Sequence, residues 1–298
     1  MAKIVAAMAM THSPGLAGWF ESAPAEEQQM ALDAFSDMRA HLREREVDVI
    51  ILIGNDHLLN WPLNNTPNYT VGIDDEHVGP ADWYDSWLQQ EEKFSVPGHS
   101  ALARFIVNES ARLGVAMSSK RDMQFDDSVT VPTLHLNPDG EYRTIPINLN
   151  CTVPPVPDQV ESYQFGITLR KILENYPGDE RIALVGTGGL SHEPGGPRYF
   201  FIDEEFDRQY LALLENGDHA QILREITMER MEEAGSGGTG ELIAWFIVMA
   251  TTKGVANVLG YAPSYSWRSG TGFVIWPEIA ASTGSGQAQS SMEKSDSM

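Results

Sequence analysis

The chain has 298 residues, 42% of them hydrophobic, which is enough to bury the core of one large domain or two small ones. Its formal net charge of −22, from 42 acidic and 20 basic residues, would repel a phosphate backbone and argues against a nucleic-acid partner. No stretch approaches the roughly 18–20 continuous apolar residues of a membrane span. The single cysteine excludes an internal disulfide and fits a reducing compartment, so we expect a cytoplasmic protein without a membrane partner.

The first half of the chain predicts strands that alternate with helices. An apolar strand over residues 3–10 is followed by a Pro-Gly turn and by a helix over about 25–46. The run V-D-V-I-I-L-I-G at 47–54 predicts a second buried strand. The polar, aromatic-rich section 57–97 is too long for a plain connector, and we expect it to form a lid or a pocket wall.

The second half continues this alternation. A helix is predicted over 100–113, and two strand-like pieces at 129–136 and 144–150 flank an Asn-Pro-Asp-Gly turn. A helix over about 158–175 then precedes a third buried strand, R-I-A-L-V-G-T at 181–187.

The remainder predicts two helices around a glycine-rich corner at 235–240 and a last strand, G-F-V-I-W, at 272–276. We therefore expect one α/β domain over residues 1–279, with a mostly buried central sheet and helices on both faces. The Ser/Gly/Gln-rich segment 280–298 is predicted to be a disordered C-terminal tail.

Three histidines each follow one of the predicted buried strands. His12, His57 and His192 come directly after the tight turns that end these strands. In open α/β sheets, ligands bind in the crevice beyond the carboxyl ends of the strands. A single histidine of this kind is usually a hydrogen-bonded structural residue. Three at one sheet edge can converge on one metal or one substrate.

A carboxylate would complete a catalytic iron site, because two histidines and one carboxylate leave open positions for oxygen and substrate. Glu241 is the best candidate, since it follows G-S-G-G-T-G and begins the apolar segment E-L-I-A-W-F-I-V-M-A. A carboxylate at a helix N-terminus is kept ionised by the local dipole. An ordinary glutamate in a first helical turn is the alternative interpretation.

Four short motifs together resemble the class III, LigB-type extradiol ring-cleavage dioxygenases. They are T-H-S-P at 11–14, N-D-H at 55–57, G-G-L-S-H at 188–192 and G-T-G-E at 238–241. The family includes protocatechuate 4,5-dioxygenase β subunits, gallate dioxygenases and dihydroxyphenylpropionate dioxygenases. The resemblance extends to about Pro277 in the same order and spacing, and G-G-L-S-H is its most specific element.

This resemblance implies an Fe(II) cofactor held by His12, His57 and Glu241, with His192 as the acid/base residue beside a vicinal aromatic diol. The implied roles agree with general chemistry, because a metal lowers the pKa of a bound hydroxyl and a histidine side chain titrates near neutrality. The resemblance also implies a homo-oligomer and allows a small separate α subunit. Expected partners are thus the aromatic substrate and O2.

Asp127 marks a departure from the family pattern. Family members carry a second pocket histidine in a D-H-G segment, whereas the matching stretch here reads M-Q-F-D-D-S. Asp127 either performs a related proton transfer or accepts a hydrogen bond from a substrate N–H, which would indicate a nitrogen heteroaromatic such as a dihydroxypyridine. A third interpretation substitutes His135 for the missing histidine, and a surface aspartate is the fourth.

Further candidates for substrate binding are His77, Trp267, Arg268 and Ser269. His77 lies in E-H-V-G-P-A-D-W, which resembles a pocket-side loop of gallate-type members, and the other three precede the last strand. Arg268 is suited to pair with a substrate carboxylate, and an ordinary arginine in a surface loop is the alternative interpretation. Two other functions remain open on the same fold: a zinc-dependent hydrolase, and a non-catalytic binding protein similar to the Memo-like proteins.

Overall fold

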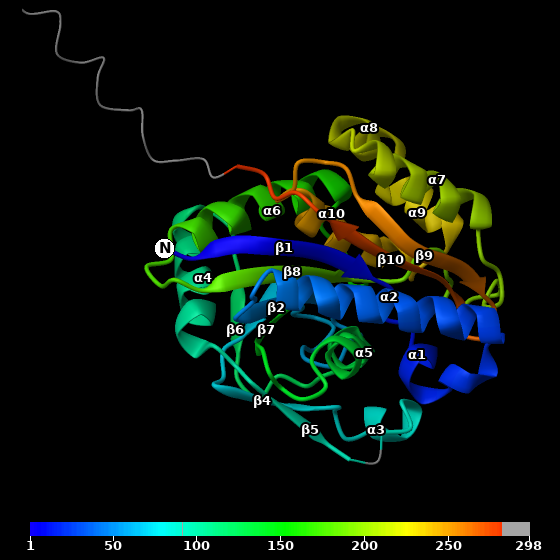
Figure 1. Cartoon of the computed structure of the whole chain (residues 1–298), viewed down its shortest axis with the longest axis horizontal. Helices are drawn as coiled ribbons and strands as arrows, with labels where there is room; N and C mark the ends of the chain where they lie inside the picture. The colour runs from blue at the N-terminus through cyan, green and yellow to red at the C-terminus, as the bar shows by residue number, and fades with distance from the viewer. Residues whose placement is uncertain (91, 282–298) are drawn as a thin grey trace, which may run out of the picture.

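An eight-stranded mixed sheet forms the centre of the molecule and carries helices on both faces (Figure 1). The computed structural model describes residues 1–90 and 92–281. The strand order is β6-β3-β7-β2-β8-β1-β10-β9. The predicted α/β fold with a central, helix-flanked sheet is confirmed. From residue 282 onward the predicted tail lies outside the described residues.

Four parallel strands occupy the middle of the sheet. They are β7 (Arg143–Leu149), β2 (Val49–Asn55), β8 (Arg181–Thr187) and β1 (Lys3–Met10). Because these strands are parallel, the chain leaves all four at the same edge of the sheet. The three strands that were predicted to end near a histidine are therefore neighbours in space.

The alternation of side chains along β2 explains its unbroken apolar sequence. Val49, Ile51 and Ile53 belong to the hydrophobic cluster on one face of the sheet. Ile50 and Leu52 belong to the cluster on the other face. A strand buried on both faces needs apolar residues at every position, which is the pattern of parallel strands covered by helices.

Antiparallel strands extend the sheet on both sides. β10 (Ser269–Trp276) pairs with β1, and β9 (Asn257–Ser264) pairs with β10. On the other side, β3 (Tyr69–Gly72) runs antiparallel to β7, and β6 (Ser118–Lys120) pairs with β3. β9 was not predicted from the sequence.

Two hydrophobic clusters join the helices to the sheet. One cluster packs α4 (Ser100–Arg112), α6 (Gln159–Glu174) and α10 (Ile243–Met249) on one face. The other packs α2 (Ala25–Glu44) and α5 (Asp127–Leu136) on the opposite face. Burial of both sheet faces provides the main stabilisation of the fold.

The strand predicted over 129–136 is wrong, because this segment forms helix α5. The side chain of Asp126 accepts the backbone N–H of Ser128 and so caps the helix. Pro132 lies inside the helix and cannot donate to the carbonyl of Ser128, four residues earlier. The hydroxyl of Thr187 donates to that carbonyl instead, at 2.8 Å. Tertiary contacts thus override the local strand preference of the β-branched run.

Most of the remaining elements are shorter. The section 57–97 contributes β3, a separate two-stranded sheet and the short helix α3. These elements are β4 (Glu76–Gly79), β5 (Phe94–Pro97) and α3 (Tyr84–Trp87). The other elements are α1 (Gly15–Gly18), the 3₁₀ turn η1 (Phe20–Ser22), α7 (Glu204–Asn216), α8 (His219–Glu225), α9 (Met228–Ala234) and the 3₁₀ turn η2 (Thr239–Leu242).

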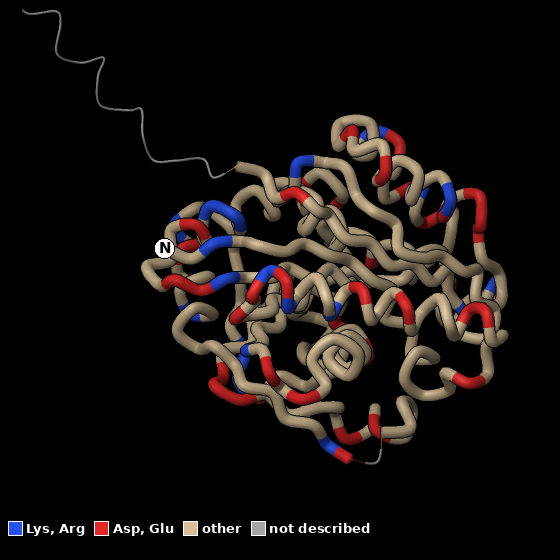
Figure 2. Tube along the Cα trace, viewed as in Figure 1, with Lys and Arg blue, Asp and Glu red and all other residues tan. Residues whose placement is uncertain are grey.

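Charged residues lie mainly on the peripheral helices and loops. Figure 2 shows Asp and Glu spread over these elements rather than gathered in one block. Among the described residues, no helix combines the length and the apolar character needed to cross a membrane.

Candidate active site

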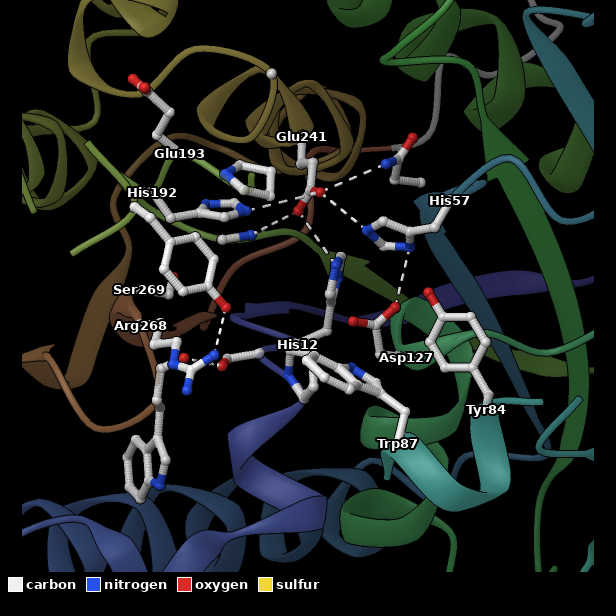
Figure 3. A pocket seen from close by; sticks show the side chains of 18 of the residues that line it. His12, His57, Tyr84, Trp87, Asp127, His192, Glu193, Glu241, Arg268 and Ser269 are labelled. Atoms are coloured by element: carbon white, nitrogen blue, oxygen red, sulfur yellow. Dashed lines mark hydrogen bonds and ion pairs between the residues drawn. The ribbon is translucent and has the colours of Figure 1, made fainter. Parts of the chain in front are cut away.

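A cavity of about 610 Å³ opens beyond the carboxyl ends of β1, β2 and β8 (Figure 3). His12 follows β1, His57 follows β2, and His192 follows β8 after a short glycine loop. All three imidazoles line the cavity, together with Glu241 from η2. These residues thus lie together at one edge of the sheet, as the sequence predicted.

The turn after β2 holds His57 in place through two aspartates. Asp56 accepts the backbone N–H groups of Leu59 and Asn60, at 3.2 and 3.1 Å. Asp126, at the start of α5, accepts the backbone N–H of His57 at 2.9 Å. Burial and the neighbouring Asp126 raise the pKa of Asp56. The turn is therefore fixed on both sides before any ligand binds.

Glu241 is buried and lies between two imidazoles. Its Oε2 is 3.2 Å from Nε2 of His12, and its Oε1 is 3.1 Å from Nε2 of His57. The backbone N–H of Gly189 donates to Oε2 at 3.1 Å. Burial alone would raise the pKa of Glu241, but the charge of His12 and hydrogen bonds from His12 and His57 hold it well below its usual range. This carboxylate is therefore ionised and suited to bind a cation.

The other ring nitrogen of His57 faces two carboxylates. Nδ1 lies 3.0 Å from Asp126 Oδ2 and 3.0 Å from Asp127 Oδ1. Burial lowers the pKa of His57, but Asp127 and Asp126 more than compensate and raise it well above its usual value. A proton on Nδ1 is thereby stabilised, and Nε2 is directed toward Glu241. Such a carboxylate behind an imidazole is typical of metal-binding histidines.

His192 is held with its Nε2 in the cavity. Its Nδ1 lies 3.0 Å from the carbonyl oxygen of Leu190, and its Nε2 lies 3.9 Å from Glu241 Oε1. Gly189 and Gly238 both lie against the imidazole, where a side chain on either glycine would collide with the ring. The glycines of two predicted motifs therefore form the slot that receives this ring.

Two groups of side chains could hold a metal here. His12, His57 and Asp127 each offer one ligand atom, and these atoms lie within 4.8 Å of one another. His12, His57 and Glu241 form the alternative group. We favour the second, because Glu241 meets the Nε2 atoms of both histidines whereas Asp127 meets Nδ1 of His57. Two imidazole nitrogens and one carboxylate fit the donor set of a ferrous ion.

Three of the four further candidates line the same cavity. Trp267 is buried and donates from Nε1 to the carbonyl of Phe20, while Ser269 donates to the carbonyl of Gly270. Arg268 reaches the cavity from a backbone with φ of 65°, which is uncommon for a residue other than glycine.

Two histidines considered from the sequence lie outside the cavity lining. His77, on β4, is buried and stacks on Phe125 at 5.6 Å between ring centroids. His135 stacks on Phe35 at 3.9 Å and hydrogen bonds the carbonyl of Leu16 through Nε2. The interpretation in which His135 replaces the missing pocket histidine is therefore wrong.

Sequence reasoning missed several residues of the site. No sequence pattern indicated a role in the site for Asp126, which lies beside His57, apart from its position before Asp127. Tyr84 and Trp87 from α3 line the cavity, which confirms that the section 57–97 forms a pocket wall. Trp19 and Tyr199 form further wall and lie near the guanidinium of Arg268.

A family model described as "Catalytic LigB subunit of aromatic ring-opening dioxygenase" matches residues 6–274. The chain belongs to the LigB family. The matched range includes His12, His57, His192 and Glu241, so the LigB resemblance drawn from four short motifs is confirmed over most of the chain.

Curated relatives in the LigB family are named as dioxygenases. A gallate dioxygenase of Pseudomonas putida is 34% identical over 180 residues, which are 59% of this chain and 52% of the relative. A 2,3-dihydroxyphenylpropionate/2,3-dihydroxicinnamic acid 1,2-dioxygenase of Photorhabdus laumondii is 25% identical over 203 residues, 68% of this chain and 60% of the relative. The matches therefore span between about half and three fifths of these relatives' own length.

The LigB fold is also similar to a solved structure. The crystal structure of an uncharacterized protein from Escherichia coli K12 aligns with a TM-score of 0.54 over 91% of this chain and 99% of the other. The sequences are 12% identical, so this similarity concerns the fold alone.

Proposed function

We propose that the protein is an Fe(II)-dependent extradiol dioxygenase that opens the ring of a vicinal aromatic diol. The observation that carries this proposal is the shared carboxylate of Glu241, which lies 3.2 and 3.1 Å from the Nε2 atoms of His12 and His57. A third imidazole, His192, stands 3.9 Å from the same carboxylate without belonging to the pair. The site thus combines a cation-binding group with a separate acid/base group.

His12, His57 and Glu241 would hold the ferrous ion. When bound, the ion would supply Lewis acidity toward the diol oxygens and a position for O2. Membership of the LigB family supports this choice of metal. The carboxylates behind Nδ1 of His57 support a proton on Nδ1, so that the lone pair of Nε2 would be the one that binds the ion.

The residues of the chain have separate tasks around the substrate. Nε2 of His192 accepts the proton of a diol hydroxyl, because Nδ1 is tied to the carbonyl of Leu190. The same nitrogen can return that proton to an oxygen bonded to the substrate as the ring opens. Aromatic walls from Tyr84, Trp87 and Trp267 orient the flat ring and limit the entry of water.

Metal content and oxygen uptake test the proposal together. Protein prepared anaerobically with Fe(II) should bind one iron per chain and consume O2 with an aromatic diol. His12→Ala, His57→Ala and Glu241→Ala should each lose most of the iron and the activity. His41→Ala, on helix α2 away from the cavity, serves as the control and should keep both.

Different results would favour the two competing functions. Preferential zinc binding, with ester or amide hydrolysis and without O2 uptake, would indicate a metal-dependent hydrolase. Unchanged iron content in all three single variants would overturn the assigned ligands. Retained fold and metal without any turnover across a panel of diols would indicate a non-catalytic Memo-like binding protein.

The substrate is proposed from the charges that line the cavity. Among the described residues, Arg268 has no carboxylate within ion-pair distance, and its guanidinium lies 5.6 Å from the Trp19 ring and 5.0 Å from the Tyr199 ring. An unpaired cation in the cavity favours a diol with a carboxylate, and the similarity to gallate dioxygenase supports this class. Asp127 supports the alternative of a nitrogen heteroaromatic diol, such as a dihydroxypyridine.

Variants of Arg268 test the proposed carboxylate. Arg268→Gln should raise KM for a carboxylated catechol by about 10- to 100-fold, the scale of one charge-assisted hydrogen bond, and leave KM for catechol unchanged. Arg112→Gln, an exposed arginine on α4, is the matched control. Equal effects of Arg268→Gln on both substrates would contradict the proposal.

We also propose that a second polypeptide covers the mouth of the cavity. Trp83, Trp87 and Leu58 line the cavity and are exposed, and Phe200 and Phe201 are exposed next to Tyr199. Exposed apolar residues gathered at one place are typical of interaction sites. A homo-oligomer, or a small α subunit, would bury them. Light scattering on the purified chain distinguishes the two, because a monomer in solution would favour the separate subunit.

A further inference from the structure

We infer that Asp207 is a positioning residue that fixes the loop carrying His192. Asp207 lies on helix α7, is fully buried, and does not line the cavity. The inference rests on the proposed acid/base role of His192. It concerns how that role is made possible, and it assigns a function to a buried carboxylate that the metal site does not use.

The carboxylate of Asp207 accepts three hydrogen bonds. The backbone N–H of Ser191 donates to Oδ1 at 2.7 Å, and the Ser191 hydroxyl donates to Oδ2 at 2.9 Å. The hydroxyl of Tyr261, on β9, donates to Oδ2 at 2.9 Å. A single side chain thus binds both the main chain and the side chain of the residue directly before His192.

Ser191 also forms hydrogen bonds with two other segments of the chain. The Ser191 hydroxyl oxygen also accepts the backbone N–H of Asp203 at 2.8 Å, which joins the loop to the start of α7. Its carbonyl accepts the backbone N–H of Gly270 at 2.9 Å, which joins the loop to β10. Every polar group of Ser191 is therefore engaged, and the residue has no freedom to rotate.

A glycine in β10 makes room for the carboxylate. A side chain at Gly270 would collide with Oδ2 of Asp207 and with Leu190. The absence of a side chain at this position therefore allows Asp207 to reach Ser191. Leu190 also provides the carbonyl that holds Nδ1 of His192, so the anchoring of this loop is transmitted directly to the imidazole.

Without the hydrogen bonds to Asp207, the loop that carries His192 would adopt other conformations. His192 would then spend less time with Nε2 toward the substrate, although the metal ligands would stay in place. Displacement of a catalytic group by about 1 Å can lower the rate by about 100-fold. The loss should therefore fall on kcat rather than on KM or on metal content.

Asp207→Asn tests the inference with the shape of the side chain retained. An asparagine can still accept the N–H of Ser191, but its amide nitrogen cannot accept the hydroxyls of Ser191 and Tyr261. We expect kcat to fall by about 10- to 100-fold with iron content and KM within twofold of wild type. Tyr210→Phe is the control and should leave kcat unchanged, because the hydroxyl of this buried tyrosine on the same helix has no hydrogen-bond partner among the described residues.

A second measurement does not require activity. In metal-free protein labelled with ¹⁵N-histidine, the shifts of His192 should report a proton on Nδ1 in the wild type and a mixture of tautomers in Asp207→Asn. The same mixture, to a smaller extent, is expected in Tyr261→Phe, which removes one hydrogen bond from Asp207. Tyr261→Phe keeps the inference testable if Asp207→Asn proves unstable.

The outcomes separate the inference from the proposed function. Wild-type protein without O2 uptake on any diol, combined with altered His192 shifts in the variants, would reject the proposed function and support the positioning role. Unchanged kcat and unchanged shifts in folded Asp207→Asn would overturn the inference. A loss of iron, a rise in KM and a fall in kcat of similar size would also overturn it, because together they would indicate general destabilisation.

Discussion

His192 donates from Nδ1 to the carbonyl oxygen of Leu190, two residues earlier in the chain, across 3.0 Å. A carbonyl can only accept, so the neutral imidazole carries its proton on Nδ1 and its lone pair on Nε2. The accepting nitrogen thus faces the cavity and Glu241 before a substrate binds. This contact within one loop therefore determines which ring nitrogen of His192, the proposed acid/base residue, carries the proton.

This geometry predicts that His192 acts in chemistry and not in metal binding. His192→Ala should bind iron and substrate as the wild type does, yet lower kcat by about 10²- to 10⁴-fold, the usual scale of general acid–base catalysis. Iron analysis and single-turnover kinetics provide the measurement. Loss of iron from this variant would make His192 a metal ligand.

Gly238 should be required for the position of the His192 ring. A Cβ atom at Gly238 would lie 2.7 Å from Nε2 of His192, which no real contact of this kind allows. Gly238→Ala is therefore expected to reduce kcat by at least about 10-fold with iron retained. Gly240→Ala is the matched control, because its Cβ would meet just the flexible end of Met228 at 3.3 Å. Similar activity of the two variants would argue against a requirement for glycine beside the His192 ring.

Asp127 is expected to influence the choice of substrate. Its carboxylate lines the cavity and adds negative charge where the family pattern has an imidazole, so it should favour a ring N–H or a cationic group beside it. On the alternative of a nitrogen heteroaromatic substrate, where this effect outweighs the attraction of Arg268 for a carboxylate, a dihydroxypyridine should be turned over better than protocatechuate or gallate. Asp127→His should then shift preference toward the carbocyclic diols.

The same residue also lies behind His57, so iron content must be measured in each Asp127 variant. A wild-type preference for a carboxylated catechol, together with an unchanged ranking in Asp127→Asn, would exclude a role in substrate choice. Asp127 would in that case serve the orientation of His57, with which it shares a 3.0 Å contact.

The raised pKa of Asp207 predicts that the free energy of unfolding depends on pH. Burial raises the pKa of Asp207 from 3.8 to about 7, so between these two pH values the folded state holds a proton that the unfolded state has released. The carboxylate that accepts three hydrogen bonds is the form present above about pH 7. The contribution of this group to the free energy of unfolding is therefore fully present below about pH 4 and is lost as the pH rises through about 7. Urea unfolding of metal-free wild type and Asp207→Asn between about pH 5 and pH 8 tests this.

The stability of the wild type relative to Asp207→Asn should decline across that range, because the amide does not titrate. A difference that stays constant or grows toward pH 7 would show that the Asp207 carboxyl is already ionised in the folded state. The three hydrogen bonds it accepts would then outweigh its burial.

The sheet and the three strand-end histidines were predictable because their cause is local. A parallel strand buried on both faces requires an unbroken apolar run, and the residue after it must reach the ligand edge. The runs before His12, His57 and His192 carry that pattern in full. The glycines before His192 and Glu241 marked the turns that the backbone needs there.

The errors arose where distant contacts decide the structure. The run Val129–Val131 favours a strand by its β-branched side chains, yet burial and the cap at Asp126 make it helical. The pairing of Asp126 with His57 joins residues 69 positions apart, which no local pattern contains. Strand β9 escaped prediction because Gly260 and Pro263 interrupt it, as an edge strand tolerates.

The proline in α5 has a consequence for the mechanics of the pocket. Because Pro132 leaves the Ser128 carbonyl without a helical donor, that carbonyl binds Thr187 at the end of β8. The helix that carries Asp127 and the strand that leads to His192 are thereby fastened to each other. Residue 132 is thus a position away from the metal site that influences the spacing between two walls of the cavity. An alanine there would supply a backbone N–H that competes with Thr187 for the Ser128 carbonyl.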